Sequence, residues 1–376
     1  MAELKIIQPA VREAGPTCCG ISSGTSRPAW VTGALTTDAG ETPVISTDLS
    51  RSELWEHVRC RVSAFRDRYS VEPGLYAVGT PGRDSDVFAS ASYKLSFDVL
   101  RKALRGLNAW VLVLDTRGIN VWCAAGKGTF GTEELVRRIS AARLGRVVDH
   151  RRIIVPQLGG PGISAHLVKK ATGFSVSYGP VRAEDISGYI GAGYTATKEM
   201  RTVRFPLVDR LVLTPMEINP AMKKYFPWYA LAMLAVFGLQ PEGILFRNAV
   251  SGALPFLLLG LVSVLAGAFV TPLLLPLVPF RSFAVKGWIM GMASTFCFVR
   301  LTGLPSQSDA LLHAFTYLFF PLASSYIALQ FTGSTTFTGM SGVKKELKVS
   351  IPLYLAGTAG SLVLLALYKL GEWRII

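Results

Sequence analysis

Residues 111–139 read VLVLDTRGINVWCAAGKGTFGTEELVRRI, and this stretch decides the fold of the larger, N-terminal part of the chain. Val111–Leu114 is a short apolar run of the kind that forms a buried strand. A helical pattern follows a glycine-rich turn, with Thr132 as its predicted N-cap and acidic Glu133 and Glu134 in its first turn. A strand that leads through such a turn into a helix is the first half of a βαβ unit.

Similar apolar runs, rich in β-branched residues, recur along the chain with helical patterns between them. The expected strands are Leu75–Val78, Val111–Leu114, Ile153–Val155, Phe174–Tyr178 and Leu211–Leu213. The expected helices are Leu54–Tyr69, Phe97–Leu107, Glu133–Leu144, Ala165–Thr172 and Ala183–Ile190. This alternation predicts an α/β domain with a mainly parallel sheet over residues 51–224. Ligands of such sheets bind outside the carboxyl ends of the strands.

Residues 1–50 differ from this domain. They are rich in Gly, Ser, Thr and Pro without a period, which indicates an irregular segment. The adjacent Cys18 and Cys19 are expected to be packed or incidental thiols rather than a trap for a soft metal. The first residues lack the apolar core of a signal peptide, so we expect the α/β domain to face the cytoplasm.

Residues 225–376 have the composition of a membrane protein. The apolar stretches predict an all-α transmembrane domain of five helices, at about 225–239, 254–278, 284–301, 310–331 and 351–370. Basic residues are more frequent on the flanks that would be cytoplasmic, as the positive-inside rule requires of a multi-pass protein of the cell (inner) membrane. His313 is the ionisable residue near a span interior, so an anchor is favoured over a transport pathway.

The charge and the cysteines exclude several classes of protein. The formal net charge is +14, but basic and acidic residues are interleaved, which argues against nucleic-acid binding. The five cysteines form neither a CxxC pair nor a Cys/His cluster, which argues against a zinc or iron–sulfur site. Reduced thiols in the cytoplasm are the simplest account.

Cys123 is a candidate functional residue because it follows a predicted strand and is surrounded by small residues. Space for a large flat partner is left by Ala124, Ala125, Gly126 and Gly128. Lys127 adds a positive charge that favours a thiolate. The alternative is a structural cysteine buried in a tight βα turn.

Two further interpretations of this turn were weighed. A phosphate-binding GxxxxGK[ST] loop fails, because Val121 stands where the first glycine is needed and Gly128 follows Lys127. GKGTFG at 126–131 matches GxGxxG literally but is a weak signal, since no suitably placed acid follows the next strand. A cysteine nucleophile needs a base, for which the sequence offers His57, His150 and His166 without selecting one.

NVWCAAGK at 120–127 closely resembles the N-(V/I)-W-C-A-(A/G)-G-K motif of the HgcA family, the corrinoid proteins of microbial mercury methylation. The soluble domain of that family is similar to the Rossmann-like corrinoid-binding domain of the corrinoid iron–sulfur protein of acetyl-CoA synthesis. SYKLSFD at 92–98 and PQLGGPG at 156–162, followed by His166, resemble further segments of the family. The resemblance extends from about Leu54 to the C-terminus, including the five-span tail.

The resemblance implies that Cys123 is the lower axial ligand of the cobalt of cobalamin or a related corrinoid, on a short cap helix. Asn120 is expected to position this helix through a hydrogen bond, and Trp122 by packing. The residues expected to bind the cofactor are Asn120, Val121, Trp122, Cys123, Ala124, Ala125, Gly126, Lys127, Gly128, Thr129, Phe130, Gly131, Gly159, Gly160 and Gly162. The DxHxxG motif of histidine ligation is absent, since Asp149-His150 is not followed by its pattern.

The function implied by the resemblance is a corrinoid-dependent methyltransferase that transfers a cobalt-bound methyl group to Hg(II), as a carbanion or a radical. The implied partners are an HgcB-like ferredoxin with two 4Fe–4S clusters as reductant, and a methyltetrahydrofolate-linked methyltransferase as methyl donor. One alternative is a corrinoid methyl carrier of acetyl-CoA-type one-carbon metabolism. The other is a membrane transporter with a cytosolic regulatory domain.

Overall fold

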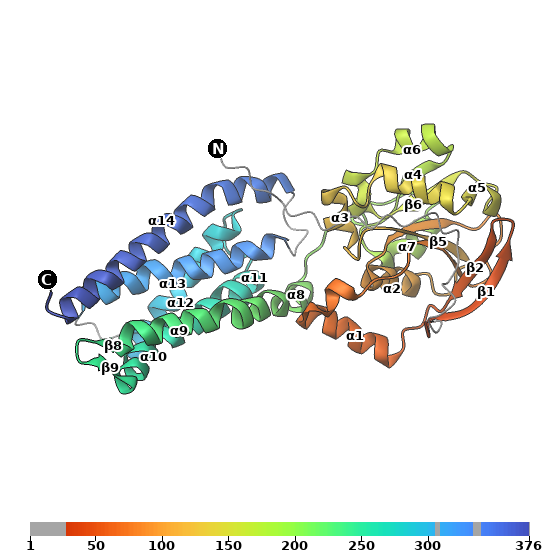
Figure 1. Cartoon of the computed structure of the whole chain (residues 1–376). Helices are drawn as coiled ribbons and strands as arrows, with labels where there is room; N and C mark the ends of the chain where they lie inside the picture. The colour runs from red at the N-terminus through yellow and green to blue at the C-terminus, as the bar shows by residue number, and fades with distance from the viewer. Residues whose placement is uncertain (1–27, 305–308, 334–339, 376) are drawn as a thin grey trace. The chain divides into compact units, whose positions relative to one another are not determined.

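The computed structural model describes residues 28–304, 309–333 and 340–375, which fall into two compact units (Figure 1). The first unit runs up to Leu54 and continues over Asp67–Thr202. The second unit contains Trp55–Arg66 and the chain from Val203 onward. The expected thiols of Cys18 and Cys19 lie outside the described residues.

The first unit is built on a seven-stranded sheet with the order β1-β2-β3-β5-β4-β6-β7. Its strands are β1 (Val31–Thr37), β2 (Gly40–Ile45), β3 (Gly74–Val78), β4 (Val87–Ala91), β5 (Ala109–Leu114), β6 (Arg152–Val155) and β7 (Ser175–Tyr178). The pairs β1–β2 and β3–β5 are antiparallel, and the other four neighbouring pairs are parallel. This confirms the predicted α/β fold with a mostly parallel sheet.

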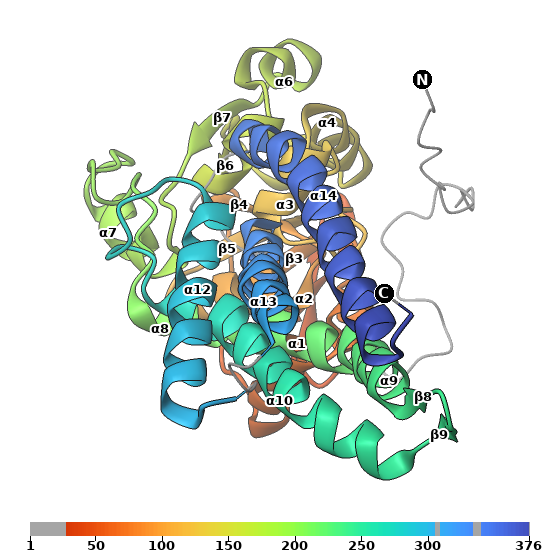
Figure 2. The same ribbon diagram turned by 90° about the vertical axis from the view of Figure 1, so that its left-hand side faces the viewer.

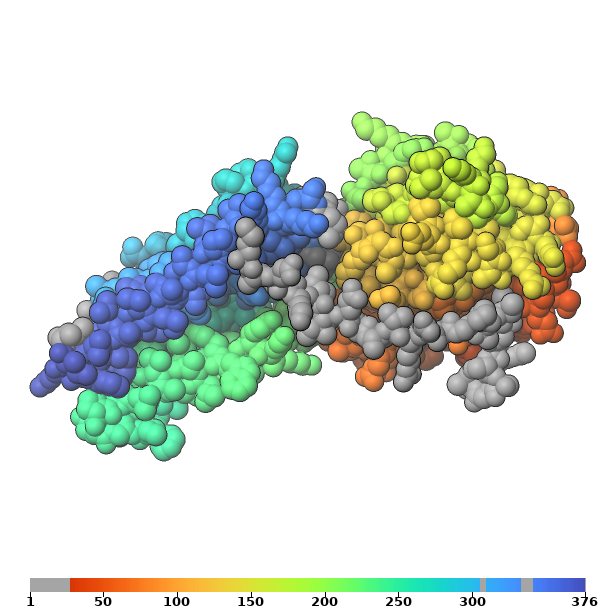
Figure 3. Space-filling view, turned by 45° about the horizontal axis from the view of Figure 1, so that its top comes forward, coloured from red at the N-terminus to blue at the C-terminus, as the bar shows by residue number. Residues whose placement is uncertain are grey.

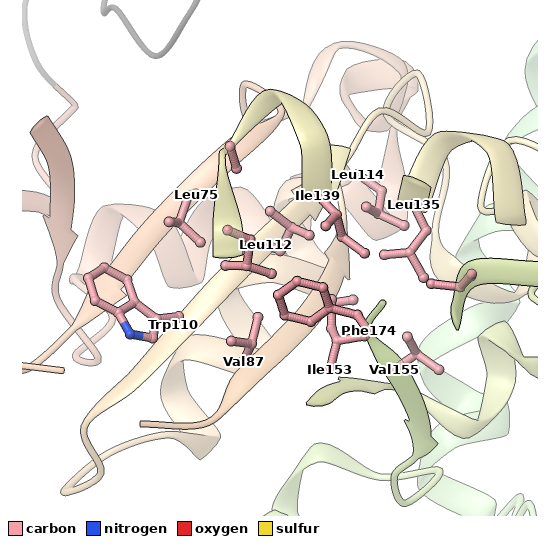
Figure 4. Packing of buried hydrophobic residues seen from close by; sticks show 14 of the residues in the cluster. Leu75, Val87, Trp110, Leu112, Leu114, Leu135, Ile139, Ile153, Val155 and Phe174 are labelled. Carbon is pink, nitrogen blue, oxygen red and sulfur yellow. The ribbon is translucent and has the colours of Figure 1, made fainter. Parts of the chain in front are cut away.

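Helices cover both faces of the sheet. One face carries α2 (Lys94–Ala103) and α7 (Ile186–Gly191), and the other carries α4 (Thr132–Ala141), α5 (Leu144–Val147) and α6 (Ala165–Thr172). Because side chains alternate along a strand, β5 places Leu112 and Leu114 in one core and Val111 and Val113 in the other. Figure 4 shows Leu112 and Leu114 packed near Ile139 and Leu135 of α4. A strand buried on both faces reads as the continuous apolar run seen in the sequence.

The strand order places a crossover point at β4. The chain passes from β4 to β5 on one side, and then crosses to β6 on the other side of β4. Because β4, β5 and β6 are parallel, their carboxyl ends meet at one edge of the sheet. In open α/β sheets, ligands bind at such a point of reversal.

Three expectations about secondary structure were wrong. Residues 31–45 are not irregular: they form the β1–β2 hairpin, whose turn uses Gly40 at φ 119°. β4 was not expected, because Ala89, Ser90 and Ala91 carry little strand signal. Leu211–Leu213 is not a strand but part of α8 (Leu207–Pro220), since a short apolar run by itself does not separate strand from buried helix.

Four charged side chains are buried together beside the carboxyl end of β4. Glu53 belongs to α1 (Arg51–Val62), whereas Lys94, Asp98 and Arg101 belong to α2. Lys94 Nζ lies 3.0 Å from Glu53 Oε1 and 2.5 Å from Asp98 Oδ1, and Arg101 Nε lies 2.7 Å from Asp98 Oδ1. Arg101 also pairs with Glu53. Two positive charges therefore face two negative charges, as buried ions require.

Glu53 should make the stability of the first unit depend on pH. Burial alone would raise the pKa of Glu53, but the Ser50 N–H bond and the charges of Lys94 and Arg101 outweigh burial and lower it below the ordinary 4.5. A carboxyl whose pKa is lowered by folding stabilises the fold above its unfolded pKa, and this contribution disappears as the pH falls through the folded pKa. Glu53→Gln should cost about 1–3 kcal/mol at pH 7, because it leaves buried donors poorly paired. Thermal unfolding from pH 7 to pH 3 should show this difference shrinking with acidity; a constant difference would contradict the assignment.

The second unit is helical. Besides α8, it contains α9 (Phe226–Gly238), α10 (Phe246–Leu265), α11 (Thr271–Leu273), α12 (Phe283–Thr302), α13 (Ala310–Gln330) and α14 (Met340–Glu372). π-helical turns at Ala221–Tyr225 and Ala266–Val270 join α8 to α9 and α10 to α11. A short hairpin of β8 (Leu239–Gln240) and β9 (Gly243–Ile244) precedes α10.

Small residues bring α12 and α13 close together, as Figure 2 shows. A Cβ atom added at Gly287 would lie 2.4 Å from the Cβ of Ala328. The hydroxyls of Ser324 and Ser325 donate to the carbonyls of Gly287 and Ala284 across this contact, at 2.9 and 2.7 Å. Close backbones with hydroxyl bonds between them are typical of helices packed in a membrane.

Three stretches among the described residues are long and apolar enough to cross a membrane: Phe246–Leu273, Ala310–Gln330 and Ser341–Glu372. Three of the five expected spans thus correspond to stretches that meet the length and composition of a membrane span, and the other two stay predictions. α9 continues the helix of α8, but its own 13 residues are the part without charged side chains, which at 1.5 Å per residue is short for a bilayer core. α12 has 20 residues, but two of them are the basic Lys286 and Arg300, which make it less apolar than the three stretches above.

Candidate functional site

Cys123 lies on a seven-residue helix, α3 (Val121–Lys127), which the chain forms just after β5. The helix begins at Asn120, whose Oδ1 accepts a hydrogen bond from the backbone N–H of Cys123 at 2.9 Å. It ends at Gly128, which adopts the left-handed conformation with φ 81°. A short helix and a hydrogen bond from Asn120 are thus present at the expected places, and the role of this helix as a cap over a corrinoid stays a prediction.

The loop between β5 and α3 is tied to β4. Ser92, directly after β4, accepts hydrogen bonds on its Oγ from the N–H groups of Thr116 and Gly118, each at 3.1 Å. Thr116 Oγ1 in turn accepts the N–H of Ser92 at 3.2 Å, and donates to the carbonyl of Ile119 at 2.6 Å. These bonds hold a loop in which Arg117 and Gly118 both have positive φ. The start of α3 is therefore set by the ends of two strands.

The first turn of α4 contacts the other side of this loop. Glu134 Oε1 accepts the backbone N–H of Asp115, just after β5, at 2.8 Å, and lies 3.0 Å from Arg138 Nη2. Thr132 was expected to be the N-cap of this helix, but Gly131 occupies that position. The Thr132 hydroxyl instead accepts the N–H of Ser164 at 2.8 Å, so it joins α4 to the start of α6.

A glycine-rich turn packs directly against α3. This turn, the 3₁₀ segment η2 (Gln157–Gly162), follows β6. A Cβ added at Gly162 would lie 2.1 Å from the carbonyl oxygen of Phe130 and 3.2 Å from the Cα of Ala125. A Cβ at Gly159 would lie 2.4 Å from the ring of Phe130, which is fully buried. The structure therefore brings together two segments that are 30 residues apart and that the sequence selected separately.

α3 has one side against the protein and one open side. Ala124 and Ala125 are buried, whereas Gly126, Lys127 and Gly128 are exposed. Cys123 is half-buried, as are Val121 and Trp122 before it and Thr129 after it. In Figure 3 the orange-yellow to yellow atoms of the stretch that contains α3 and α4 lie at the surface of the first unit. Cys123 is thus placed at an open edge and not within the core.

A metal at this edge would find one protein ligand. No three His, Cys, Asp or Glu side chains form a potential metal-binding group in the described parts of the chain. A lone thiol among small residues suits a metal that arrives with its other ligands already in a flat ring. The donor set and the open, glycine-lined edge therefore fit a corrinoid.

Gln157 adds a polar group at the same edge. Its Oε1 is buried and has no hydrogen-bond partner among the described residues. It is the first residue of η2, immediately after the carboxyl end of β6. A buried carbonyl oxygen without a donor is unusual and indicates an unrecorded partner, for which an amide N–H of a ligand is chemically suitable. The PQLGGPG segment was singled out from the sequence, but not this side chain.

Other residues that the sequence offered lie elsewhere or are already bonded. His150 precedes β6, at the opposite edge of the sheet, and its Nε2 lies 2.9 Å from the carbonyl of Ser85. His166 Nδ1 lies 2.9 Å from the hydroxyl of Ser164. A hollow of about 410 Å³ also lies away from α3, between the ends of α4 and α6 and the start of β7. The rings of His150 and His166 are therefore each bonded to a group other than Cys123.

Comparison with known proteins shows which proteins the α/β unit resembles. Residues 59–190, from the end of α1 to α7, match the family described as CO dehydrogenase/acetyl-CoA synthase delta subunit. The gamma subunit of the acetyl-CoA decarbonylase/synthase complex of Archaeoglobus fulgidus is 30% identical over 130 residues, which are 33% of this chain and 27% of that protein.

Two further relatives match over a similar length of the chain. The gamma subunit of Methanopyrus kandleri is 27% identical over 134 residues, 35% of this chain and 29% of its own length. Gamma subunit 1 of Methanosarcina thermophila is 29% identical over 132 residues, 33% and 27%. The chain spans less than a third of the length of these relatives. Its α/β unit is therefore a distant and partial homologue of the gamma subunits of the acetyl-CoA decarbonylase/synthase complex.

Proposed function

We propose that this protein is a corrinoid-dependent methyltransferase that methylates Hg(II), with Cys123 as an axial ligand of the corrinoid cobalt. The observation that carries the proposal is the position of Cys123. It lies on a short, firmly held helix, half-exposed at the carboxyl edge of the sheet, within the segment NVWCAAGK. The relatives are gamma subunits of an acetyl-CoA decarbonylase/synthase complex. Joining or separating the methyl and carbonyl carbons of an acetyl group is one-carbon chemistry, so this homology supports methyl transfer by the α/β unit.

The residues around Cys123 have separate tasks in this proposal. Asn120 fixes the backbone of Cys123, so that the thiol is presented from a set position. Lys127, one helical turn further on, adds a positive charge on the same side of α3 and favours a thiolate. Gly126 and Gly128 leave the surface beside the thiol free of side chains. Gln157 offers an acceptor to an amide at the rim.

A corrinoid, when bound, supplies a cobalt that carries a methyl group between a donor and an acceptor, and a thiolate ligand makes that methyl group more electron-rich than an imidazole does. Hg(II) is a soft electrophile, so it suits such a methyl group. The proposed methyl donor is a methyltetrahydrofolate-linked methyltransferase. The proposed reductant is a ferredoxin with two 4Fe–4S clusters.

The second unit is proposed to hold the protein in the cell membrane, with the α/β unit in the cytoplasm. The three long apolar helices support anchoring. The flanking Lys344, Lys345 and Lys348 at the start of α14 support a cytoplasmic position for that end.

A corrinoid methyl carrier of acetyl-CoA-type metabolism is the second candidate, because the relatives are subunits of such a complex. The two functions differ in the acceptor of the methyl group. The apolar helices of the second unit favour mercury, and so does a thiolate ligand, because it promotes transfer of the methyl group to an electrophile.

The test uses the full-length protein, purified without oxygen and loaded with methylcobalamin. The loaded protein is offered Hg(II) chloride, and methylmercury is measured by gas chromatography with mercury detection. We expect methylmercury in proportion to bound cofactor, against a control with the same methylcobalamin and no protein. A protein that binds the cofactor but forms methylmercury no faster than this control would exclude mercury and favour the carrier. Failure to bind the corrinoid would exclude both.

A further inference from the structure

Helix α1 carries an apolar stripe that the protein leaves uncovered. One side of the helix is buried, at Glu53, His57 and Cys60. The other side exposes Leu54, Trp55, Val58 and Val62, with 49, 64, 44 and 37% of their surfaces open. Positions 54, 58 and 62 recur every four residues and share one face, with Trp55 beside them. A contiguous apolar stripe of this kind marks an interaction surface.

The stripe is flanked by positive charge. Arg51 and Arg59 are exposed on the same helix, and Arg66 and Arg68 follow in the 3₁₀ turn Ala64–Arg68. Acidic side chains are fewer here: Glu53 is engaged with Lys94 and Arg101, and the others are Glu56 and Asp67. Trp and Arg are side chains that are favoured where a protein meets lipid head groups, because each combines an apolar body with a polar tip. The arginine charges suit anionic lipid head groups.

Contacts tie the end of this stripe to α8 of the second unit. Trp55–Arg66 belongs to the second unit, where the side-chain amide of Asn219 donates to the carbonyl of Val62. Arg66 Nη1 lies 3.8 Å from the sulfur of Met216. Both partners lie near the end of α8.

The helix α8, which contacts the end of α1, continues beyond Asn219 into a more apolar stretch. After Asn219 the chain continues through the π-helical turn, with exposed Lys223 and Lys224, into α9. α9 exposes large apolar side chains, Trp228 at 73% and Leu231 at 58%. Lysines followed by apolar exposure mark the border between water and lipid on a membrane helix. The apolar stripe of α1 therefore ends where this border lies.

We propose that α1 is an interfacial helix, whose face of Leu54, Trp55, Val58 and Val62 is inserted among the lipid head groups of the membrane that holds the second unit. The occupant is the bilayer surface, preferably with anionic lipid, and not a protein partner. This inference rests on the membrane location in the proposed function, and is independent of the corrinoid and of mercury.

The test uses full-length protein in nanodiscs of phosphatidylcholine and phosphatidylglycerol, with its seven tryptophans replaced by 5-fluorotryptophan. The fluorine signal of residue 55 is assigned by its loss in Trp55→Phe. A lipid with a nitroxide on its head group should broaden the signal of Trp55 strongly, and leave that of Trp110, 2% exposed in the sheet, sharp. Equal sharpness of the two signals would overturn the proposal. A nitroxide on the acyl chain should broaden Trp228; if it does not, the membrane location itself fails.

A matched pair of variants separates insertion from chance proximity. Val58→Asp should reduce the broadening of Trp55 at least twofold, because the charge opposes insertion. Val99→Asp is the control, since Val99 in α2 has a similar exposure of 43%, and should leave the broadening unchanged. Unchanged broadening in Val58→Asp would show that the stripe is not inserted. Nanodiscs without phosphatidylglycerol should give weaker broadening than those with it.

Discussion

Replacing Cys123 with alanine should abolish methylmercury formation by the corrinoid-loaded, full-length protein. The loss should be about 100-fold or more, since removing even groups that orient a metal ligand costs 10–100-fold. The fold should survive, because Asn120 holds the backbone of residue 123 and not its side chain. Methylmercury is measured as above, at equal amounts of folded protein.

Cys123→His is the matched control for the ligand. It offers a nitrogen donor at the same position, so the absorption spectrum should show a ligand-bound cobalt that differs from the wild-type spectrum, while Cys123→Ala should show no protein ligand. The histidine variant should retain cofactor and transfer methyl to Hg(II) more slowly than wild type. Wild-type activity in the alanine variant would refute ligation by Cys123.

Replacing Gly162 with alanine should have the largest effect on stability at this edge. The added Cβ would lie 2.1 Å from the carbonyl oxygen of Phe130, and a backbone atom cannot move aside as a side chain can. η2 and α3 must therefore separate, at a cost of about 3 kcal/mol, the upper part of the range for overpacking. Thermal unfolding should occur several degrees lower, and corrinoid affinity should fall with it.

Neighbouring glycines provide the control series. At Gly160 an added Cβ would meet the ring of Tyr178 at 3.5 Å, an ordinary contact, so Gly160→Ala should be nearly neutral. Gly159→Ala should be intermediate or severe, because it meets the fully buried ring of Phe130 at 2.4 Å. If Gly160→Ala and Gly162→Ala destabilise equally, the close packing of η2 on α3 is not what holds this edge.

Much of this edge could be predicted because its signals are local. The apolar run of β5, the glycines after it and the acidic start of α4 lie within one stretch of sequence. The bond from Asn120 to the N–H of Cys123 also spans only three residues. Helix starts and turns are decided by such short-range chemistry, so a single sequence reveals them.

The rest depended on contacts that no short pattern encodes. Ser92 and Thr116 are 24 residues apart, and their bonds form only when β4 pairs with β5. β4 itself is a strand because both of its faces are buried, although Ala89, Ser90 and Ala91 have little strand preference. The orphaned oxygen of Gln157 could not be foreseen, since its burial is a property of the folded edge. In the second unit, apolar composition predicted the helices, and three of the expected spans meet the length and composition of a membrane span.

The hydrogen bond of Asn120 fixes the backbone of residue 123 independently of the side chain that this residue carries. The bond that sets residue 123 in place ends on a backbone N–H, which every amino acid except proline carries. A single codon change there could exchange sulfur for oxygen or nitrogen without redesign of the surrounding loops. Proteins that share this arrangement are thus free to diverge in chemistry at one position, and divergence in reaction need leave little trace in overall similarity.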